Sequence, residues 1–154
     1  LILADEPTSA LDVVVQRQIM QTLRELQLQL EATVLLVGHD MGLMAQFAER
    51  VGIMYGGKLV EVGSVTEVFR NPQHPYTQLL ISSIPSFERR GIFKGIPGVG
   101  LSLLDPPSGC LFHPRCPQAM ERCSRDEPGL TSLGTEGHVS CLLHEKEETH
   151  GTSA

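Results

Sequence analysis

The sequence predicts an α/β fold in which parallel strands alternate with helices. Two short aliphatic runs, Leu1–Ala4 and Thr33–Val37, each lead into polar residues, which is typical of buried strands in a parallel sheet. Between them, Val13–Glu31 carries apolar residues at spacings of three and four, as one face of a helix does. A strand, a helix and a second strand in this order predict a βαβ unit.

The helix of this unit has a start signal and an apolar face. Asp12 suits the N-cap position, because its carboxylate can accept hydrogen bonds from the first free amides of a helix. We expect the apolar face to pack against the sheet rather than to bind a partner; its residues are Val15, Ile19, Leu23, Leu26 and Leu30.

Three polar residues follow the two strands at the point where each strand ends. Asp5 and Glu6 come directly after the first strand, and His39 comes one residue after the second. Open α/β sheets bind ligands at the carboxyl ends of their strands, so we expect the three side chains at one edge. An aspartate there can hold Mg²⁺, a second acid can activate a water, and a histidine can reach a phosphate. Polar residues that merely leave a strand, or a structural histidine, remain the alternative reading.

The wider string, Asp5-Glu6-Pro7-Thr8-Ser9-Ala10-Leu11-Asp12, closely resembles the Walker B segment and D-loop of ABC-transporter ATPase subunits. The resemblance implies the C-terminal part of a P-loop NTPase domain that binds ATP and Mg²⁺. It also implies that Asp5 supports the metal and that Glu6 polarises the attacking water. By the same resemblance, Ser9 to Asp12 face a second ATPase subunit across a nucleotide-sandwich dimer.

His39 is similar in position to the switch histidine of the H-loop in the same family, which contacts the γ-phosphate of ATP. Gly38 departs from the family pattern, in which threonine or serine usually precedes that histidine. The sequence contains neither the phosphate-binding G-x-x-x-x-G-K-[ST] loop nor a signature resembling L-S-G-G-Q. We therefore interpret the chain as a fragment and expect no ATP hydrolysis from it alone.

Turn and cap signals divide the middle of the chain. Gly56-Gly57 predicts a hairpin between strands at 50–55 and 58–62, and Ser64 to Glu67 is a capping box. The segment Asn71-Pro72-Gln73-His74-Pro75-Tyr76-Thr77-Gln78-Leu79-Leu80 resembles the N-P-x-H-P-Y-T-x-x-L element of dipeptide and oligopeptide importer ATPases, which nickel importers share. We expect an ATPase part over residues 1–85, a cysteine-rich extension over 86–144 and a disordered tail over 145–154.

All four cysteines lie in the predicted extension, at Cys110, Cys116, Cys123 and Cys141. Clustered thiols in a reducing compartment favour metal binding over disulfides. Their spacing suits neither a simple zinc ribbon nor a bacterial ferredoxin run, so spacing alone leaves zinc and an iron–sulfur cluster open. Histidines nearby are alternative ligands, but exposed loop positions explain them better, since four thiolates already complete a site; they are His113, His138 and His144.

The segment from Gly109 to Pro117, Gly-Cys-Leu-Phe-His-Pro-Arg-Cys-Pro, strongly resembles the C-terminal extension of peptide-importer ATPases. The resemblance implies a [4Fe–4S] cluster on the four cysteines, with Zn²⁺ or reduced thiols as alternatives. A small, loop-rich module of this kind gains folding free energy from a bound metal, and a redox-sensing role is the other option.

Composition limits the remaining possibilities. The net charge is −6, which argues against a nucleic-acid-binding surface, and no apolar run approaches the ~20 residues of a membrane-spanning helix. The sequence therefore predicts an ATPase subunit of a dipeptide or oligopeptide importer, peripheral at the cytoplasmic face of the inner membrane. Its expected partners are transmembrane permease subunits and a second ATPase subunit, identical or paralogous.

Three rival functions stay open at this stage. The chain is alternatively the ATPase subunit of a nickel or other solute importer, since the motifs define the subfamily better than the solute. It is alternatively a non-catalytic metal-binding or redox-regulatory module joined to a vestigial ATPase. A soluble ABC-type ATPase acting on DNA or ribosomes is the third rival, against which the acidic charge counts.

Overall fold

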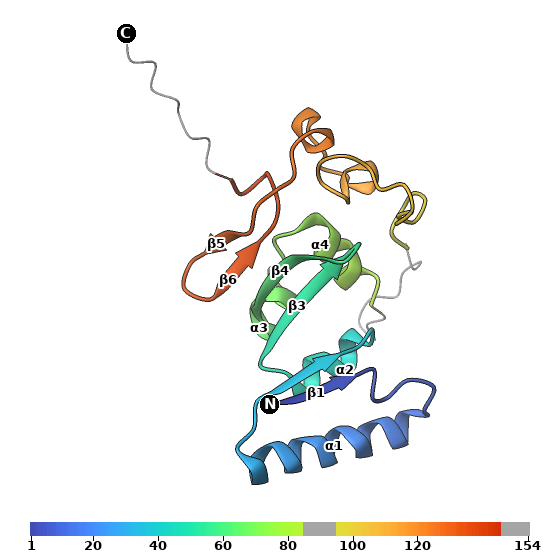
Figure 1. Cartoon of the computed structure of the whole chain (residues 1–154), viewed down its shortest axis with the longest axis vertical. Coiled ribbons are helices and arrows are strands. Elements are labelled where there is room, and N and C mark those ends of the chain that lie inside the picture. Colours follow the sequence, from blue (N-terminus) through green and yellow to red (C-terminus); the bar gives the residue numbers. More distant parts are fainter. Residues whose placement is uncertain (85–94, 146–154) are drawn as a thin grey trace. The chain divides into compact units, whose positions relative to one another are not determined.

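A computed structural model describes residues 1–84 and 95–145 of the chain (Figure 1). The chain divides into two compact units, Leu1–Glu49 and Arg50–Ala154. The predicted boundary near residue 85 and most of the predicted tail lie outside the described residues. The described helices are not long and apolar enough to cross a membrane.

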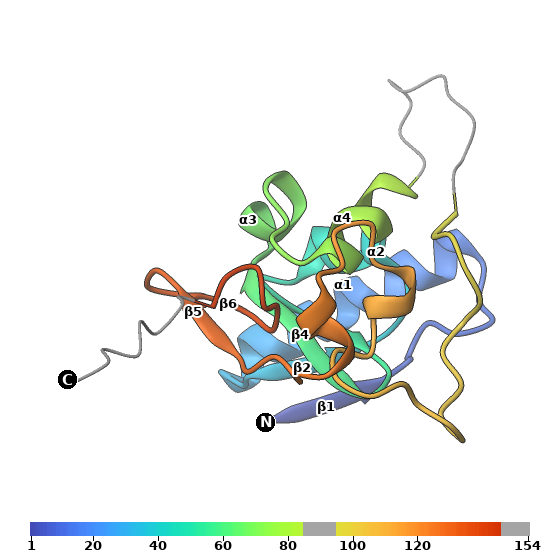
Figure 2. The same cartoon turned by 90° about the horizontal axis from the view of Figure 1, so that it is seen from above.

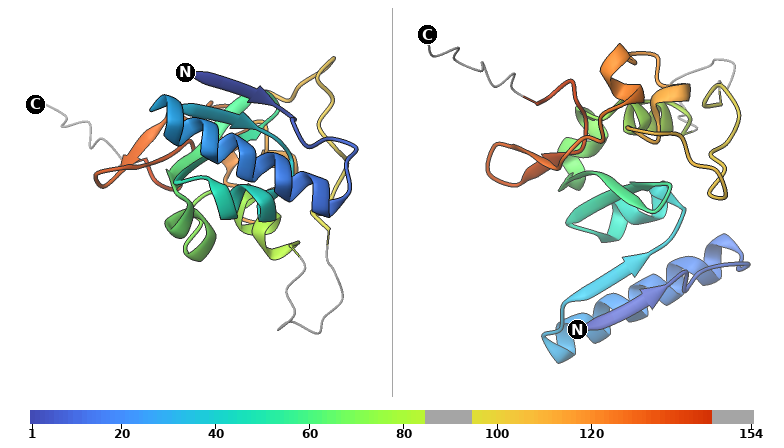
Figure 3. Two further views of the ribbon diagram at one scale, coloured as in Figure 1. Left: turned by 90° about the horizontal axis from the view of Figure 1, so that it is seen from below. Right: turned by 45° about the horizontal axis from the view of Figure 1, so that its top comes forward.

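The first unit is the predicted βαβ unit followed by a short helix. It consists of β1 (Ile2–Asp5), α1 (Val13–Leu30), β2 (Val34–Val37) and α2 (Met41–Phe47). The two strands pair in parallel, with Ile2 opposite Val34 and Asp5 opposite Val37, which confirms the predicted parallel arrangement. Figure 3 shows α1 running alongside this pair of strands.

Helix α1 begins and ends where its sequence provides a cap. The carboxylate oxygen Oδ1 of Asp12 accepts hydrogen bonds from the amides of Val14 and Val15, at 2.9 and 3.0 Å, as predicted. Glu31 adopts a left-handed conformation with φ of 48°, which ends the helix. The most buried side chain of the helix is Met20, at 2% exposure.

The predicted apolar face of α1 is wrong in part. Val15, Leu26 and Leu30 are exposed, while Ile19 and Leu23 are only partly covered. The face that packs is rotated toward Met20, because the two strands are short and cover only a narrow stripe of the helix.

The expectation that both strands are fully buried is also wrong. Along each strand alternate residues are exposed, including Leu3, Leu35 and Val37 at 67%, 55% and 45%. Helices cover both faces of parallel sheets in complete domains. In the first unit only one face is covered.

The second unit is built on a four-stranded antiparallel sheet in the order β3-β4-β6-β5. Strands β3 (Arg50–Tyr55) and β4 (Lys58–Ser64) form the predicted hairpin, in which Gly56 and Gly57 have φ of 58° and 81°. Such positive φ values suit a two-residue hairpin turn, and glycine adopts them without strain. Figure 2 shows β6 and β5 extending this sheet beside β4.

The cysteine-rich extension contributes two strands to that sheet, so it is less irregular than predicted. Strand β6 (Gly137–Val139) pairs with β4 through Glu61 opposite Val139, and β5 (Thr131–Leu133) pairs with β6. Two short 3₁₀ helices, η1 (His113–Arg115) and η2 (Glu121–Ser124), precede these strands.

Two helices follow β4 in the second unit. Helix α3 (Val65–Arg70) starts at Ser64, whose hydroxyl accepts from the amide of Glu67 at 3.2 Å, so the N-cap half of the predicted capping box is present. Helix α4 (Pro75–Ser82) starts with proline in its first turn.

An aromatic cluster forms the core between the hairpin, α4 and the extension. Phe112, at 1% exposure, lies 5.2 and 5.3 Å from the rings of Tyr55 and Tyr76 in edge-to-face geometry. The ring of His74 is tilted against the same phenyl ring, with the two ring centroids 5.9 Å apart. Edge-to-face contacts are favourable because the positive edge of one ring meets the negative face of another. The cluster therefore joins the extension to the hairpin inside one unit.

Candidate functional site

The first candidate site is the carboxyl edge of β1 and β2. The amide of Glu6 donates to the carbonyl of Val37 at 2.8 Å, which continues the parallel ladder one step past Asp5. This extra step brings the two strand ends together. Nδ1 of His39 then lies 3.2 Å from a carboxylate oxygen of Glu6, although the two residues are 33 positions apart.

The site is open to solvent. The side chains of His39 and Glu6 are 78% and 48% exposed. Asp5 precedes Glu6 and is exposed too. The structure thus places Asp5, Glu6 and His39 at one edge, as the sequence predicted. Two carboxylates and an imidazole at one edge can bind a cation, orient a water and contact a phosphate.

The loop after Glu6 is held by local hydrogen bonds and two unusual backbone conformations. The amide of Ser9 donates to the carbonyl of Glu6 at 3.0 Å, and Glu6 and Ala10 have φ of 43° and 60°. Positive φ costs energy for residues other than glycine and is often found at functional sites. Ser9 and Asp12 are exposed here, and Asp12 is engaged as the N-cap of α1.

Gln16 is a residue at this site that sequence reasoning missed. Its side-chain amide donates to the carbonyl of Thr8 at 3.2 Å and so ties the loop to the first turns of α1. The only signal for this role in the sequence is that Gln16 lies in the first turns of the helix, close to its N-cap residue Asp12.

The loop that carries His39 is fixed from both sides. Oδ1 of Asp40 accepts from the amide of Leu43 at 2.9 Å and so caps α2. A Cβ atom at Gly38 would lie 2.5 Å from the terminal methyl of Met44. That methyl is the end of a flexible side chain that can move aside, so this contact does not by itself require glycine at position 38.

The second candidate site is the set of four cysteines in the second unit. Cys123 and Cys141 are buried, Cys110 and Cys116 are partly buried, and all four are free thiols. The amide of Met120 donates to the sulfur of Cys123 at 3.4 Å. Nearby backbone amides lower the pKa of the other three cysteines, against the larger effect of burial; they belong to Phe112 and His113, to Gln118 and to Leu143 respectively.

The four cysteines lie close enough to one another for the charge on one to affect the pKa of another. Burial raises the pKa of Cys110 and of Cys116, and it raises the pKa of Cys141 to about 11. Negative charge on the other three cysteines adds to the rise of the Cys141 pKa. Without a metal the three thiols are therefore neutral, and a metal must displace their protons on binding.

The described residues contain no group of three or more histidine, cysteine, aspartate or glutamate side chains placed to hold one metal ion. An assembled zinc site is therefore not seen, and the expected iron–sulfur site is not confirmed. The donor chemistry still fits a larger centre. A four-iron cluster offers ligand positions at separate corners, so its thiolates lie farther apart than thiolates that share one ion.

His74, which belongs to the importer-like motif, has a buried structural role. Its Nδ1 accepts from the amide of Tyr76 at 3.0 Å, and its own amide donates to the buried carboxylate of Glu61 at 2.9 Å. Burial lowers the pKa of His74 from 6.5 to about 4, and His144 contributes to the shift.

We expect this shift to make the second unit less stable in mild acid. Above pH 6.5 His74 is neutral in both folded and unfolded chains, whereas between pH 6.5 and 4 only the unfolded chain binds the proton. The free energy of unfolding should therefore fall by about 3 kcal/mol over that range. Urea denaturation across the range measures it. His74→Asn, which keeps the cap and cannot titrate, should flatten the profile; an unchanged slope in that variant would contradict the assignment.

Comparison with known proteins shows which proteins the chain is similar to. Residues 60–123 match the family described as "Oligopeptide/dipeptide transporter, C-terminal region". The chain is 48% identical over 147 residues to the dipeptide transport ATP-binding protein DppD of Caldanaerobacter subterraneus. It is 42% identical over 142 residues to DppD of Escherichia coli, and 40% identical over 148 residues to the oligopeptide transport ATP-binding protein AppF of Bacillus subtilis.

These alignments cover most of this chain but less than half of each relative. They include 95%, 92% and 94% of the chain, and 45%, 43% and 45% of the three relatives. The chain is therefore similar to ATP-binding proteins of dipeptide and oligopeptide transport and spans about 45% of their length.

Proposed function

We propose that this chain supplies the water-activating part of the ATP site of a dipeptide or oligopeptide importer. The observation that carries the proposal is the 3.2 Å contact between His39 and Glu6 at the carboxyl edge of β1 and β2. The names of the relatives, which describe ATP-binding proteins of dipeptide transport, support the same function.

Each residue of the edge has a role in this proposal. The Asp5 carboxylate would hold Mg²⁺, which would neutralise charge on the phosphates of ATP. Glu6 accepts a hydrogen bond from the attacking water and orients it in line with the γ-phosphate. His39 contacts the γ-phosphate through Nε2, the ring nitrogen that does not face Glu6. Positioning and electrostatics of this kind account for most of the catalysis of phosphoryl transfer.

Ser9 to Asp12 face a second ATPase subunit in the proposal. Ser9 and Asp12 are both exposed. The loop is held by its turns and by the hydrogen bond from the Gln16 side chain to the carbonyl of Thr8. A rigid, exposed loop suits a contact that forms when two subunits close on ATP. The closed pair then acts on permease subunits at the cytoplasmic face of the membrane.

Hydrolysis and transport assays test this proposal. The chain alone should not hydrolyse ATP, since its sequence lacks the phosphate-binding loop. An intact subunit that contains it, reconstituted with its permease in vesicles, should couple ATP hydrolysis to uptake of a labelled dipeptide. Hydrolysis that proceeds without any effect of permease or peptide would contradict the transport role.

We also propose that Cys110, Cys116, Cys123 and Cys141 hold a [4Fe–4S] cluster. The electrostatic interaction among the four cysteines supports it, and so does the amide of Met120 at the sulfur of Cys123, because such an amide stabilises anionic sulfur. Such a cluster would cross-link the 3₁₀ helices to the end of β6, and metal binding would add folding free energy.

Metal analysis under anaerobic conditions tests this second proposal. The chain should contain iron and sulfide in near-equal amounts, and Cys141→Ser should lose most of both and unfold at lower urea concentration. His138→Gln, in the same region but not among the four thiols, should keep them. Zinc in place of iron, or a folded anaerobic chain without metal, would contradict the cluster.

A further inference from the structure

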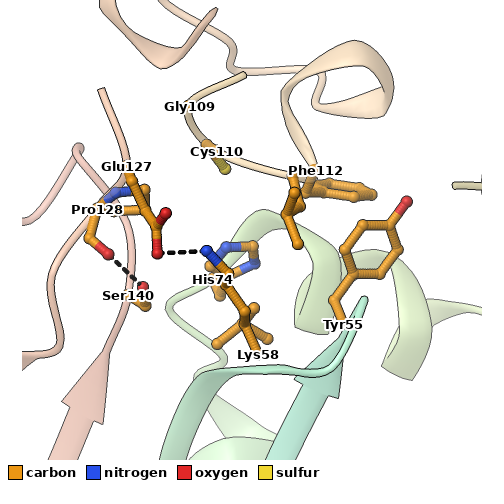
Figure 4. Close-up of a pocket in the computed structure, with 11 residues that line it drawn as sticks. Tyr55, Lys58, His74, Gly109, Cys110, Phe112, Glu127, Pro128 and Ser140 are labelled. Carbon is orange, nitrogen blue, oxygen red and sulfur yellow. Dashed lines mark hydrogen bonds and ion pairs between the residues drawn. The ribbon is translucent and has the colours of Figure 1, made fainter. Parts of the chain in front are cut away.

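Two segments of the extension are bonded directly to each other in the second unit. The amide of Cys110 donates to the carbonyl of Cys123 at 2.9 Å, and the hydroxyl of Ser108 donates to the carbonyl of Ser124 at 2.6 Å. These two hydrogen bonds form a clamp, and Gly109 lies between them. Figure 4 shows Gly109 and Cys110 on one loop. The clamp therefore brings together two cysteines from different parts of the extension.

Gly109 permits this close approach because it has no side chain. A Cβ atom there would lie 2.5 Å from the carbonyl oxygen of Cys123 and 2.9 Å from the amide nitrogen of Arg125. Both are main-chain atoms, which cannot turn aside as the end of a flexible side chain can. Gly109 also has φ of 69°. Among the glycines with positive φ in the described ranges, only Gly109 would place a Cβ against main-chain atoms.

The cysteine on each side of the clamp is held in place by further contacts. Cys110 lies two residues before Phe112, which is 1% exposed in the aromatic cluster. Cys123 is buried, and its sulfur accepts from the amide of Met120 at 3.4 Å. Burial raises the pKa of Cys110, and charge on the nearby Cys123 adds to the rise. A methyl group at Gly109 would therefore displace one of two fixed ligands relative to the other.

We propose that Gly109 is a positioning residue for the metal centre, and that its missing side chain sets the spacing at which Cys110 and Cys123 bind one cluster. The inference rests on the [4Fe–4S] cluster proposed above. Ordinary contact begins at 3.4 Å, so a Cβ at 2.5 Å would force a separation of about 0.9 Å. That exceeds the ~0.5 Å within which functional sites hold their ligands.

A glycine that only turns the chain would need positive φ but no close contact. Gly134 is such a residue, with φ of 72° and nothing within 4 Å of an added Cβ. Gly109→Ala and Gly134→Ala therefore form a matched pair, because both place alanine at positive φ and only the first also meets main-chain atoms.

Iron release from the loaded chain tests the proposal. Each full chain is loaded anaerobically with iron and sulfide, and the decay of its visible absorption in the presence of an iron chelator is timed. Gly109→Ala should lose iron at least ~10-fold faster than the wild type, while Gly134→Ala should match the wild type. Equal rates in the two variants would overturn the proposal.

Hydrogen exchange in the metal-free chain separates this inference from the cluster itself. The amide of Cys110, which is bonded across the clamp, should exchange at least ~10-fold faster in Gly109→Ala and stay protected in Gly134→Ala. A wild-type chain that takes up no iron would overturn the cluster. Equal protection of this amide in both variants would overturn the role of Gly109.

Ser108→Ala is the second variant, in case Gly109→Ala does not fold. It removes the hydrogen bond to Ser124 without adding an atom to the clamp, and should speed iron loss at least ~3-fold. Ser132→Ala is its control, because the Ser132 hydroxyl also donates to a main-chain carbonyl, that of Gly134, at 3.0 Å. Iron loss from Ser108→Ala that is no faster than from Ser132→Ala would overturn the proposal.

Discussion

Glu6→Gln in an intact subunit is expected to bind ATP normally and to hydrolyse it at least ~100-fold more slowly. The change keeps the shape of the side chain and a hydrogen bond to His39. It removes the negative charge that orients and polarises the water. Binding depends on the phosphate-binding elements, so the loss should appear in kcat with little change in KM. ATP should therefore accumulate in a closed pair of subunits.

Single-turnover hydrolysis and nucleotide retention measure this effect. Glu31→Gln is the matched control, because Glu31 is an exposed glutamate that only ends α1. It should hydrolyse ATP like the wild type. Normal turnover in Glu6→Gln would exclude Glu6 as the residue that activates water.

Glu61→Ala is expected to lower the free energy of unfolding of the chain by about 3 kcal/mol. Glu61 is 3% exposed, and its two carboxylate oxygens accept from the amides of Gln73 and His74 at 2.8 and 2.9 Å. These two bonds hold the turn that leads into α4. Truncation leaves both amides without an acceptor and opens a cavity between β4 and the turn.

Urea denaturation followed by circular dichroism measures this loss. Glu61→Gln keeps one oxygen acceptor and should lose only part of the stability. Glu121→Ala removes a carboxylate from an exposed ion pair with Arg125 and should cost under ~1 kcal/mol. A loss in Glu61→Ala no greater than that in Glu121→Ala would show that the buried carboxylate does not hold the turn.

Local signals predicted most of the elements, because each rests on neighbouring residues. Asp12 marked the start of α1, Gly56-Gly57 marked the hairpin, and Ser64 marked α3. The edge of β1 and β2 was predicted for the same reason, since two apolar runs that each end in polar residues place those residues together. Asp5, Glu6 and His39 could therefore be found without any contact information.

Features that depend on distant residues could not be predicted. In the sequence, Glu61 is a charged residue within a predicted strand, with no sign of its role. The amides that donate to its carboxylate belong to Gln73 and His74, in a turn twelve residues later. The pairing of β4 with β6 joins residues nearly eighty positions apart, so the extension was expected to be separate and irregular. The exposed face of β1 and β2 was missed because an apolar run does not reveal how many of its faces are covered.

A double-mutant cycle on Glu6 and His39 tests the central claim most directly, since the claim is that the two residues act as one unit on ATP. Turnover would be measured for Glu6→Gln, His39→Ala and the double variant in the intact subunit. The contact at 3.2 Å predicts that the double variant is about as slow as the slower single variant. Losses that multiply in the double variant would mean that the two residues act independently and would contradict the claim.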